Sequence, residues 1–225
     1  MITDVPLPNA QYSYRYGKKI TFMKIKYTLL ILLFFTLSIA TAQENKKGAI
    51  KTKDGFILYF NLKKNSYTLN LSGKTDLSNY PIVKLNDKSF EIVFTPKSKF
   101  GNEPRKILTN YMNWELDYVK KIYKKEIKSK SYFLEHNKML VNIWQYNPQL
   151  VKTKEIYTPV KTVYYIHLVH NDFVYTFSYP SFSGNELEAK KFLLKLVDGI
   201  HFYKKNIDVN KLQEITIKGV YSYKD

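Results

Sequence analysis

Apolar and polar positions alternate most clearly in residues 163–169 and 173–179, which lie on either side of Asn171 and Asp172. Both runs are rich in aromatic and β-branched residues, the composition of a pleated, half-buried surface. Asn and Asp tolerate the positive φ that a two-residue turn requires. The pattern therefore predicts a β-hairpin with one almost wholly apolar face. Its opposed pairs are His170 with Phe173, Leu168 with Tyr175, Ile166 with Phe177, and Tyr164 with Tyr179.

A helix is predicted directly after this hairpin, where it covers the apolar face. Pro180 closes the second strand because it has no amide donor for the ladder. Ser183 and Glu186 have the spacing of a capping box, and Gly199 is placed to end the helix. The apolar residues at helical spacing are Ala189, Phe192, Leu193, Leu196, Val197 and Ile200.

A second, longer helix is predicted from Asn102 as its cap, with Pro104 in the first turn. Its end is basic, which suits the negative end of the helix dipole. The apolar stripe that should pack on the sheet consists of Ile107, Tyr111, Trp114, Tyr118 and Ile122, widened by Leu108, Met112 and Val119.

Three more hairpins follow from alternation and turn residues. They join residues 56–62 to 66–71, residues 82–85 to 89–94, and residues 132–135 to 138–146, the last around His136 and Asn137. Residues 43–48 are predicted to form a mobile leader and residues 214–223 a final strand. The fold class is thus α+β, with a mostly antiparallel sheet and two main helices.

The order of these elements resembles the PsbP-like fold, which is shared with the Ran-binding nuclear import factor and with small bacterial envelope proteins. Residues 90–96, 164–180 and 189–202 carry the resemblance, within a core of about residues 81–202. The resemblance implies a central antiparallel sheet with helices packed on both faces, an αβα sandwich. It also implies an accessory or docking protein without an enzymatic constellation. Residues 43–80 have no place in the minimal pattern.

Residues 23–42 have the pattern of a secretory signal peptide. Lys24 and Lys26 precede an apolar run at 29–40, and Ala40 and Ala42 form a small-residue cleavage pattern before Gln43. This run of twelve residues, interrupted by Thr36 and Ser38, is shorter than the roughly 20 residues that a spanning helix needs. We expect cleavage near Ala42 and a secreted or periplasmic product, residues 43–225, that forms one domain with no transmembrane span. Met23 would be the start of such a peptide, which leaves residues 1–22 as an upstream extension.

The cysteine content excludes several kinds of site, and the charge bears on the kind of partner. The 225 residues contain no cysteine, which excludes disulfides, thiol nucleophiles and thiolate metal sites. The whole chain contains 36 Lys and Arg residues and 19 Asp and Glu residues. Residues 1–42 hold five of the basic residues and one of the acidic ones, so residues 43–225 carry a net charge of +13. This charge is compatible with an anionic partner. The chain has two arginines, Arg15 and Arg105. Nucleic acid is therefore disfavoured as a partner, because specific recognition of phosphates and bases usually relies on the bidentate guanidinium group of arginine.

No catalytic or metal constellation is visible in the sequence. His167 and His170 point to opposite faces of one strand, and Glu115 and Asp117 do not face each other on a helix. We therefore predict no catalytic, cofactor or metal residues. The four histidines are His136, His167, His170 and His201, and the carboxylates include Glu186 and Glu188 at a helix start.

A sugar or peptide groove lined by tyrosines is a further alternative to ordinary cross-strand packing. Its members would be Tyr132, Tyr146, Tyr157, Tyr164 and Tyr165.

The function predicted first is a non-catalytic accessory protein of the envelope that docks to another macromolecule, with a protein as the first choice of partner. The first alternative is a lysine-rich binder of anionic envelope polymer, and the second is a secreted hydrolase without a known motif. Docking predicts an exposed apolar or aromatic patch on the more mixed face of the central hairpin, around Tyr165 and His167. A hydrolase predicts a pocket where a carboxylate or serine meets a histidine.

Overall fold

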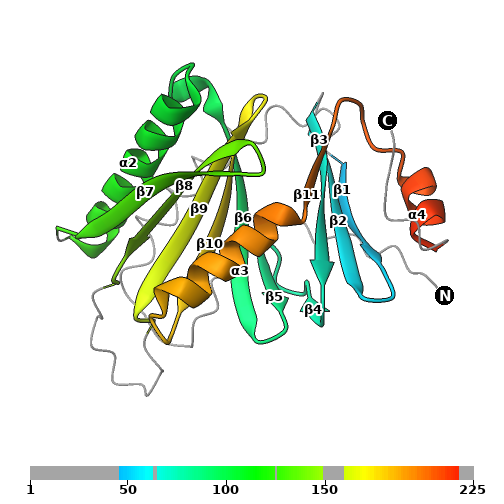
Figure 1. Cartoon of the computed structure of the whole chain (residues 1–225), viewed down its shortest axis with the longest axis horizontal. Coiled ribbons are helices and arrows are strands. Elements are labelled where there is room, and N and C mark those ends of the chain that lie inside the picture. The colour runs from blue at the N-terminus through cyan, green and yellow to red at the C-terminus, as the bar shows by residue number, and fades with distance from the viewer. Residues whose placement is uncertain (1–45, 63–64, 125, 149–159, 218–225) are drawn as a thin grey trace, which may run out of the picture.

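The computed structural model describes residues 46–62, 65–124, 126–148 and 160–217. Its larger sheet has seven antiparallel strands in the order β4-β5-β6-β10-β9-β8-β7 (Figure 1). Mixed α+β structure with antiparallel sheets is therefore confirmed. The strands are β4 (Thr75–Asp76), β5 (Ile82–Leu85), β6 (Lys88–Pro96), β7 (Ser129–His136), β8 (Met139–Tyr146), β9 (Thr162–His170) and β10 (Phe173–Ser181).

A second sheet has four antiparallel strands in the order β1-β2-β3-β11. The hairpin of β2 and β3 is the predicted one, whereas the predicted leader is wrong from Lys46 onward. That segment forms β1 because it pairs along β2 and buries Ala49 and Ile50. The strands are β1 (Lys46–Lys51), β2 (Gly55–Leu62), β3 (Asn65–Ser72) and β11 (Ile200–Tyr203).

The main core lies between the two sheets and is closed on one side by α3 (Glu186–Asp198). Rings from both sheets meet there. Phe60 stacks on Tyr67 at 4.6 Å between centroids, and Tyr67 meets Tyr175 of the larger sheet edge-on at 5.0 Å. Such offset and edge-on pairs add to the gain from apolar burial.

The central hairpin of β9 and β10 has the register that the sequence predicts, with all four opposed pairs confirmed. Asn171 has φ of 46°, the left-handed conformation that the turn requires. Tyr175 and Phe177 of β10 therefore face the core between the sheets, and Val174 faces the other way.

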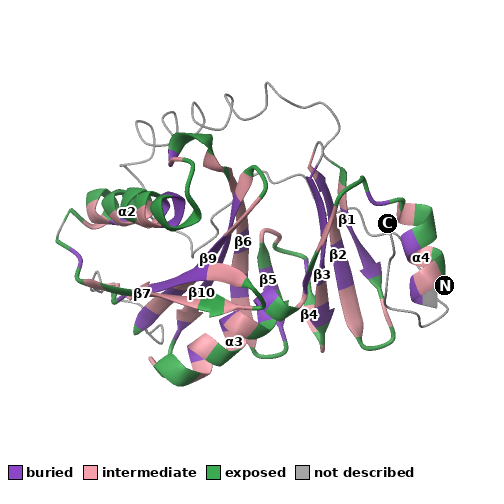
Figure 2. Ribbon diagram, turned by 45° about the horizontal axis from the view of Figure 1, so that its top comes forward, coloured by how far each residue is buried: buried purple, intermediate pink, exposed green. Residues whose placement is uncertain are grey.

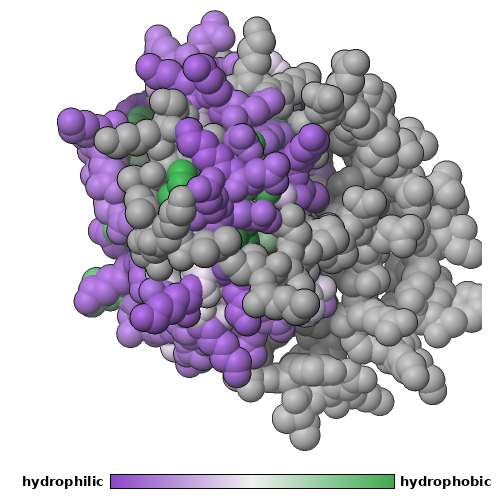
Figure 3. Space-filling view, turned by 90° about the vertical axis from the view of Figure 1, so that its right-hand side faces the viewer, coloured by the Kyte–Doolittle hydropathy of each residue, from purple (hydrophilic) through white to green (hydrophobic). Residues whose placement is uncertain are grey.

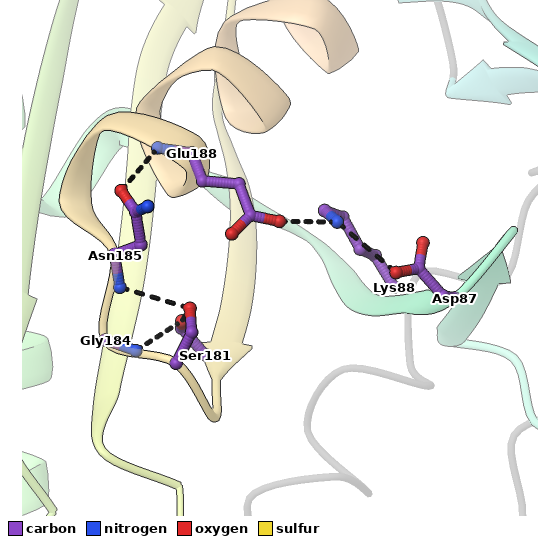
Figure 4. A network of polar contacts seen from close by, with 7 residues as sticks. Asp87, Lys88, Ser181, Gly184, Asn185 and Glu188 are labelled. Atoms are coloured by element: carbon purple, nitrogen blue, oxygen red, sulfur yellow. Dashed lines mark hydrogen bonds and ion pairs between the residues drawn. The ribbon is translucent and has the colours of Figure 1, made fainter.

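The N-cap of α3 lies two residues later than predicted. Asn185, not Ser183, is the N-cap, and its Oδ1 accepts from the Glu188 amide at 3.1 Å (Figure 4). Ser183 supports the turn instead, since its Oγ accepts from the Asn185 amide. The Glu188 carboxylate pairs with Lys88 of β6 at 2.7 Å, which ties the helix start to the sheet.

Gly199 ends α3, as predicted, but for a different reason. Its φ of −76° needs no glycine. A Cβ there would lie 2.6 Å from the Asn70 carbonyl oxygen of β3, so glycine is needed for close approach between helix end and sheet.

The predicted strand at residues 214–223 is wrong in its described part, because helix α4 (Val209–Ile217) occupies that place. Residues 218–223 lie outside the described residues. Leu212 of α4 packs with Ile50 and Ile57 on the outer face of the smaller sheet. Asn61 holds the preceding segment through two hydrogen bonds with the Ile207 backbone.

The remaining hairpins confirm the predicted pairs with small shifts. The turn between β7 and β8 is formed by Asn137 and Lys138, both with positive φ, so that His136 is the last residue of β7. After β6 come the short helix η1 (Lys97–Lys99) and the long helix α2 (Pro104–Tyr123), whose N-cap is Glu103 rather than Asn102.

Candidate functional site

Helix α2 covers the face of the larger sheet that points away from the smaller sheet. Ile107, Leu108 and Tyr111 in its first half pack around Val174 of β10. Val119 in its second half packs with Trp144 of β8. The predicted exposed patch around Tyr165 and His167 is therefore wrong. His167 is 0% exposed, and the ring of Tyr165 stacks on Trp144 at 4.3 Å.

The outer side of α2 carries a line of large apolar side chains that the sequence placed in the core. Trp114, Tyr118 and Ile122 are 52%, 55% and 56% exposed, and we call these three residues the outer stripe. Exposed positions along α2 are visible in Figure 2. The three residues are spaced by four, so they lie on neighbouring turns of one helix side.

The predicted α2 stripe is wrong in its second half because the line of contact moves around the helix. Ile107 and Tyr111 contact the sheet in the first half, whereas Val119 does so in the second. Val119 lies about 100° around the helix from Tyr118. A straight helix over a twisted sheet does not keep one side in contact along its whole length.

The ring of Trp114 is held in place although half of it is exposed. It lies 5.9 Å from the ring of Phe100 and 5.7 Å from that of Tyr111, both buried. These contacts limit the rotamers open to the Trp114 side chain.

A polar layer lies beneath α2, between the helix and the sheet. Trp144 Nε1 donates to His167 Nε2 at 3.2 Å, and Glu115 Oε2 lies 2.9 Å from the same nitrogen. A nitrogen that accepts from Trp144 has no proton to donate to Glu115. The two contacts therefore exclude each other, since Nε2 either accepts from Trp144 or donates to Glu115. The Nδ1 of His167 is buried without a partner.

Further polar groups in this layer come from neighbouring strands and from α2. Tyr111 Oη and Thr95 Oγ1 are 3.1 Å apart. Burial raises the pKa of Tyr146 to about 12, so its hydroxyl is neutral. Burial likewise raises the pKa of Glu91, which the hydrogen bond from Ser178 partly offsets.

A carboxylate does meet a histidine in this layer, but the contact is enclosed. Glu115 retains 16% side-chain exposure and His167 none. Within the described residues, no group of three or more His, Asp or Glu side chains is placed to hold a metal ion.

The other residues singled out in the sequence are dispersed. His136 Nε2 contacts Asp198 of α3 at 2.6 Å, and His170 stacks on Phe202 at 3.7 Å between centroids. His170 thus lies on the opposite face of the larger sheet from His167, as predicted. Asp117 is exposed on α2 and His201 on β11.

The tyrosines proposed for a groove do not line one surface. Tyr164 is buried and donates to the Gly184 carbonyl near α3, whereas Tyr146 and Tyr165 pack with Trp144 under α2. Tyr132 is half-buried, with Lys190 over its ring. Tyr157 lies outside the described residues.

No protein-family model and no curated protein matches the chain. Among solved structures it is similar to cyanobacterial PsbP (CyanoP) from Synechocystis sp. PCC 6803, at 9% identity and a TM-score of 0.41. The likeness covers 72% of this chain and 96% of that one. The match is to the family that the order of elements resembles. At this identity and TM-score the likeness concerns the fold, and no conclusion about function rests on it.

Within the described residues, no helix is long and apolar enough to cross a lipid bilayer.

Proposed function

We propose that the chain is an exported, non-catalytic accessory protein of the cell envelope that docks to a partner there through the outer stripe of α2. In this proposal residues 23–42 are a signal peptide, cleaved near Ala42. Residues 43–225 form a single domain in which α2 and α3 flank the larger sheet on its two faces.

The observation that carries the proposal is the exposure of the outer stripe. Trp114, Tyr118 and Ile122 are each more than half exposed, although other apolar residues of α2 are buried. Trp and Tyr are the residue types that contribute most to binding energy in protein interfaces. A surface helix normally turns its polar side outward, so an aromatic outer side favours a partner.

A catalytic function is less well supported, because the contact of Glu115 with His167 lies beneath α2. A general acid or base must come within hydrogen-bond reach of a substrate proton. Glu115 meets His167 beneath α2, where the histidine side chain is fully buried. A hydrolase that used this pair would require α2 to move away from the sheet.

The proposal is tested by retention of envelope components on immobilised residues 43–225 at low and high salt. The variant Trp114→Ala/Tyr118→Ala removes the two stripe rings. Leu187→Ala is the matched control, because Leu187 is 62% exposed on α3. We expect the stripe variant to lose a component that the parent and the control both retain at high salt. Equal retention by all three proteins would exclude the stripe as the docking surface.

The second candidate function, binding of anionic polymer through distributed lysine charge, is favoured by the charge of the chain, +17 in total. Such binding is screened over a Debye length of about 8 Å at physiological salt. It predicts retention that disappears at high salt and does not depend on the two stripe rings.

A further inference from the structure

Lysine side chains border the outer stripe of α2. Lys121 follows Tyr118 by three residues, so the two lie on the same side of the helix. Lys124, the C-cap residue, follows at the helix end. Both lysines are exposed, and neither takes part in an ion pair among the described residues. Lys120, by contrast, pairs with Glu126 at 3.1 Å.

Little negative charge opposes these lysines on the same helix. α2 contains two acidic residues, and Glu115 points inward to His167. Asp117 is therefore the exposed acid of the helix. The exposed surface of α2 thus combines an apolar line with an excess of positive charge.

The size and shape of the outer stripe favour a flat partner. Its three residues extend over about 12 Å of helix, given a rise of 1.5 Å per residue. A stable protein interface involves about 20–30 residues on each side. The other large exposed apolar residues of the described chain lie elsewhere, on β5 (Ile82) and around the start of α3 (Phe182 and Leu187). A convex line of three side chains fits a membrane interface better than the centre of a protein interface.

A second copy of this chain is a poor occupant for the stripe. Each copy carries the same excess of positive charge, which opposes association. The view onto the side of the molecule with β1, β2 and α4 shows a mostly hydrophilic surface, with small hydrophobic spots (Figure 3). The described residues on that side therefore offer no broad apolar surface to receive the stripe.

We propose that the outer stripe of α2 binds the surface of an anionic phospholipid membrane. The rings of Trp114 and Tyr118 lie at headgroup depth, where amphipathic aromatic side chains are favoured. Lys121 and Lys124 extend their apolar stems along the interface and place their ammonium groups at lipid phosphates. This inference rests on the proposed function, because it names the partner class of the same docking surface.

The test is co-sedimentation of residues 43–225 with lipid vesicles. These residues are used because every described strand, helix and core cluster lies within residues 46–217. One set of vesicles is phosphatidylcholine alone, and the other is an equal mixture of phosphatidylcholine and phosphatidylglycerol. We expect binding to the mixed vesicles and little to phosphatidylcholine. The bound protein should show a blue shift of tryptophan emission that Trp114→Phe removes, because Trp144 is 0% exposed.

Two pairs of variants separate the stripe from overall charge. Trp114→Ala/Tyr118→Ala should lower the partition coefficient at least about tenfold, since interfacial binding scales with buried apolar area. Lys121→Glu/Lys124→Glu should also lower it at least about tenfold, as each lysine near an anionic surface contributes about a factor of five. Lys51→Glu/Lys53→Glu makes the same change in net charge at the β1–β2 hairpin and should have a much weaker effect. Far-UV circular dichroism verifies that each variant is folded.

The other outcomes overturn the inference in distinguishable ways. Absence of binding to mixed vesicles, combined with stripe-dependent retention of a protein from envelope extract, would make the partner a protein and leave the proposed function intact. Equal loss of vesicle binding in both lysine pairs, with no effect of the aromatic pair, would show that distributed charge binds the lipid. In that case the stripe would not be the lipid-binding surface, and the proposed function would be decided separately by stripe-dependent retention from envelope extract.

Discussion

The exposed position of Ile122 predicts that its replacement by alanine costs less stability than the same replacement of the smaller Val119. Ile122 and Val119 are β-branched residues three positions apart on α2. Ile122 is 56% exposed, whereas Val119 is 7% exposed and packs with Trp144 and Tyr146. Replacement by alanine removes more carbon atoms from Ile122 than from Val119. The structure nevertheless predicts the larger loss of stability at Val119.

The magnitudes follow from burial. A fully buried methylene group contributes about 0.8 kcal/mol, so Val119→Ala loses about 1.5 kcal/mol of transfer free energy. The cavity left behind adds to this loss. Less than half of Ile122 is buried, which limits the transfer term of Ile122→Ala to about 1 kcal/mol. Because alanine has a higher helix propensity than valine or isoleucine, it offsets about 0.5 kcal/mol of the loss in both variants. The net expectations are about 1–2 kcal/mol for Val119→Ala and about 0.5 kcal/mol for Ile122→Ala.

Urea unfolding of residues 43–225, followed by far-UV circular dichroism, measures both values under identical conditions. If the two variants unfold with the same slope as the parent, their midpoints report the change in stability directly. A loss for Ile122→Ala equal to or greater than that for Val119→Ala would show that Ile122 packs inside the protein. The outer stripe would then not be a free surface.

Three further predictions concern the scaffold. Asn61→Ala leaves the backbone N–H and C=O of the buried Ile207 without their partners, and should lower the free energy of unfolding by about 2–5 kcal/mol in urea titrations. Gly199→Ala places a methyl group against the Asn70 carbonyl. It should lower the free energy of unfolding by about 1–3 kcal/mol, which a fall in melting temperature would reveal. Because burial raises the pKa of Glu91 above 4.5 in the folded state, its ionisation opposes folding. Glu91→Gln should therefore stabilise the protein at neutral pH. The gain in stability should shrink as the pH falls through the raised pKa and should vanish below 4.5. A gain that does not change with pH would refute burial of the charged carboxylate as its cause.

The hairpins were predictable because their information is local. Asn171 and Asp172 fix the turn between β9 and β10, and the alternation of residues on either side allows one register. The same holds for the pairing of β5 with β6. The cap of α3 was displaced from Ser183 to Asn185 because both residue types accept from free amides, and the sequence does not say which one does.

The second sheet and the true contact line of α2 were not predictable in the same way. β1 is short and largely polar, and its strand conformation depends on pairing with β2. α4 buries Leu212 against the back of that sheet, a contact between distant parts of the chain. Exposure of the outer stripe depends on how α2 crosses the larger sheet, which periodicity alone does not encode. The contact of Glu115 with His167 likewise joins residues more than fifty positions apart.

The most direct test of docking through α2 is site-specific photo-crosslinking in an envelope fraction. A benzophenone side chain replaces Tyr118 in one protein and Leu187 in another, since both positions are more than half exposed. We predict a discrete crosslinked species, protein or lipid, from position 118 and none from position 187. Identical crosslinking from the two positions, or none from position 118 while the domain remains folded, would contradict the assignment of the outer stripe as the docking surface.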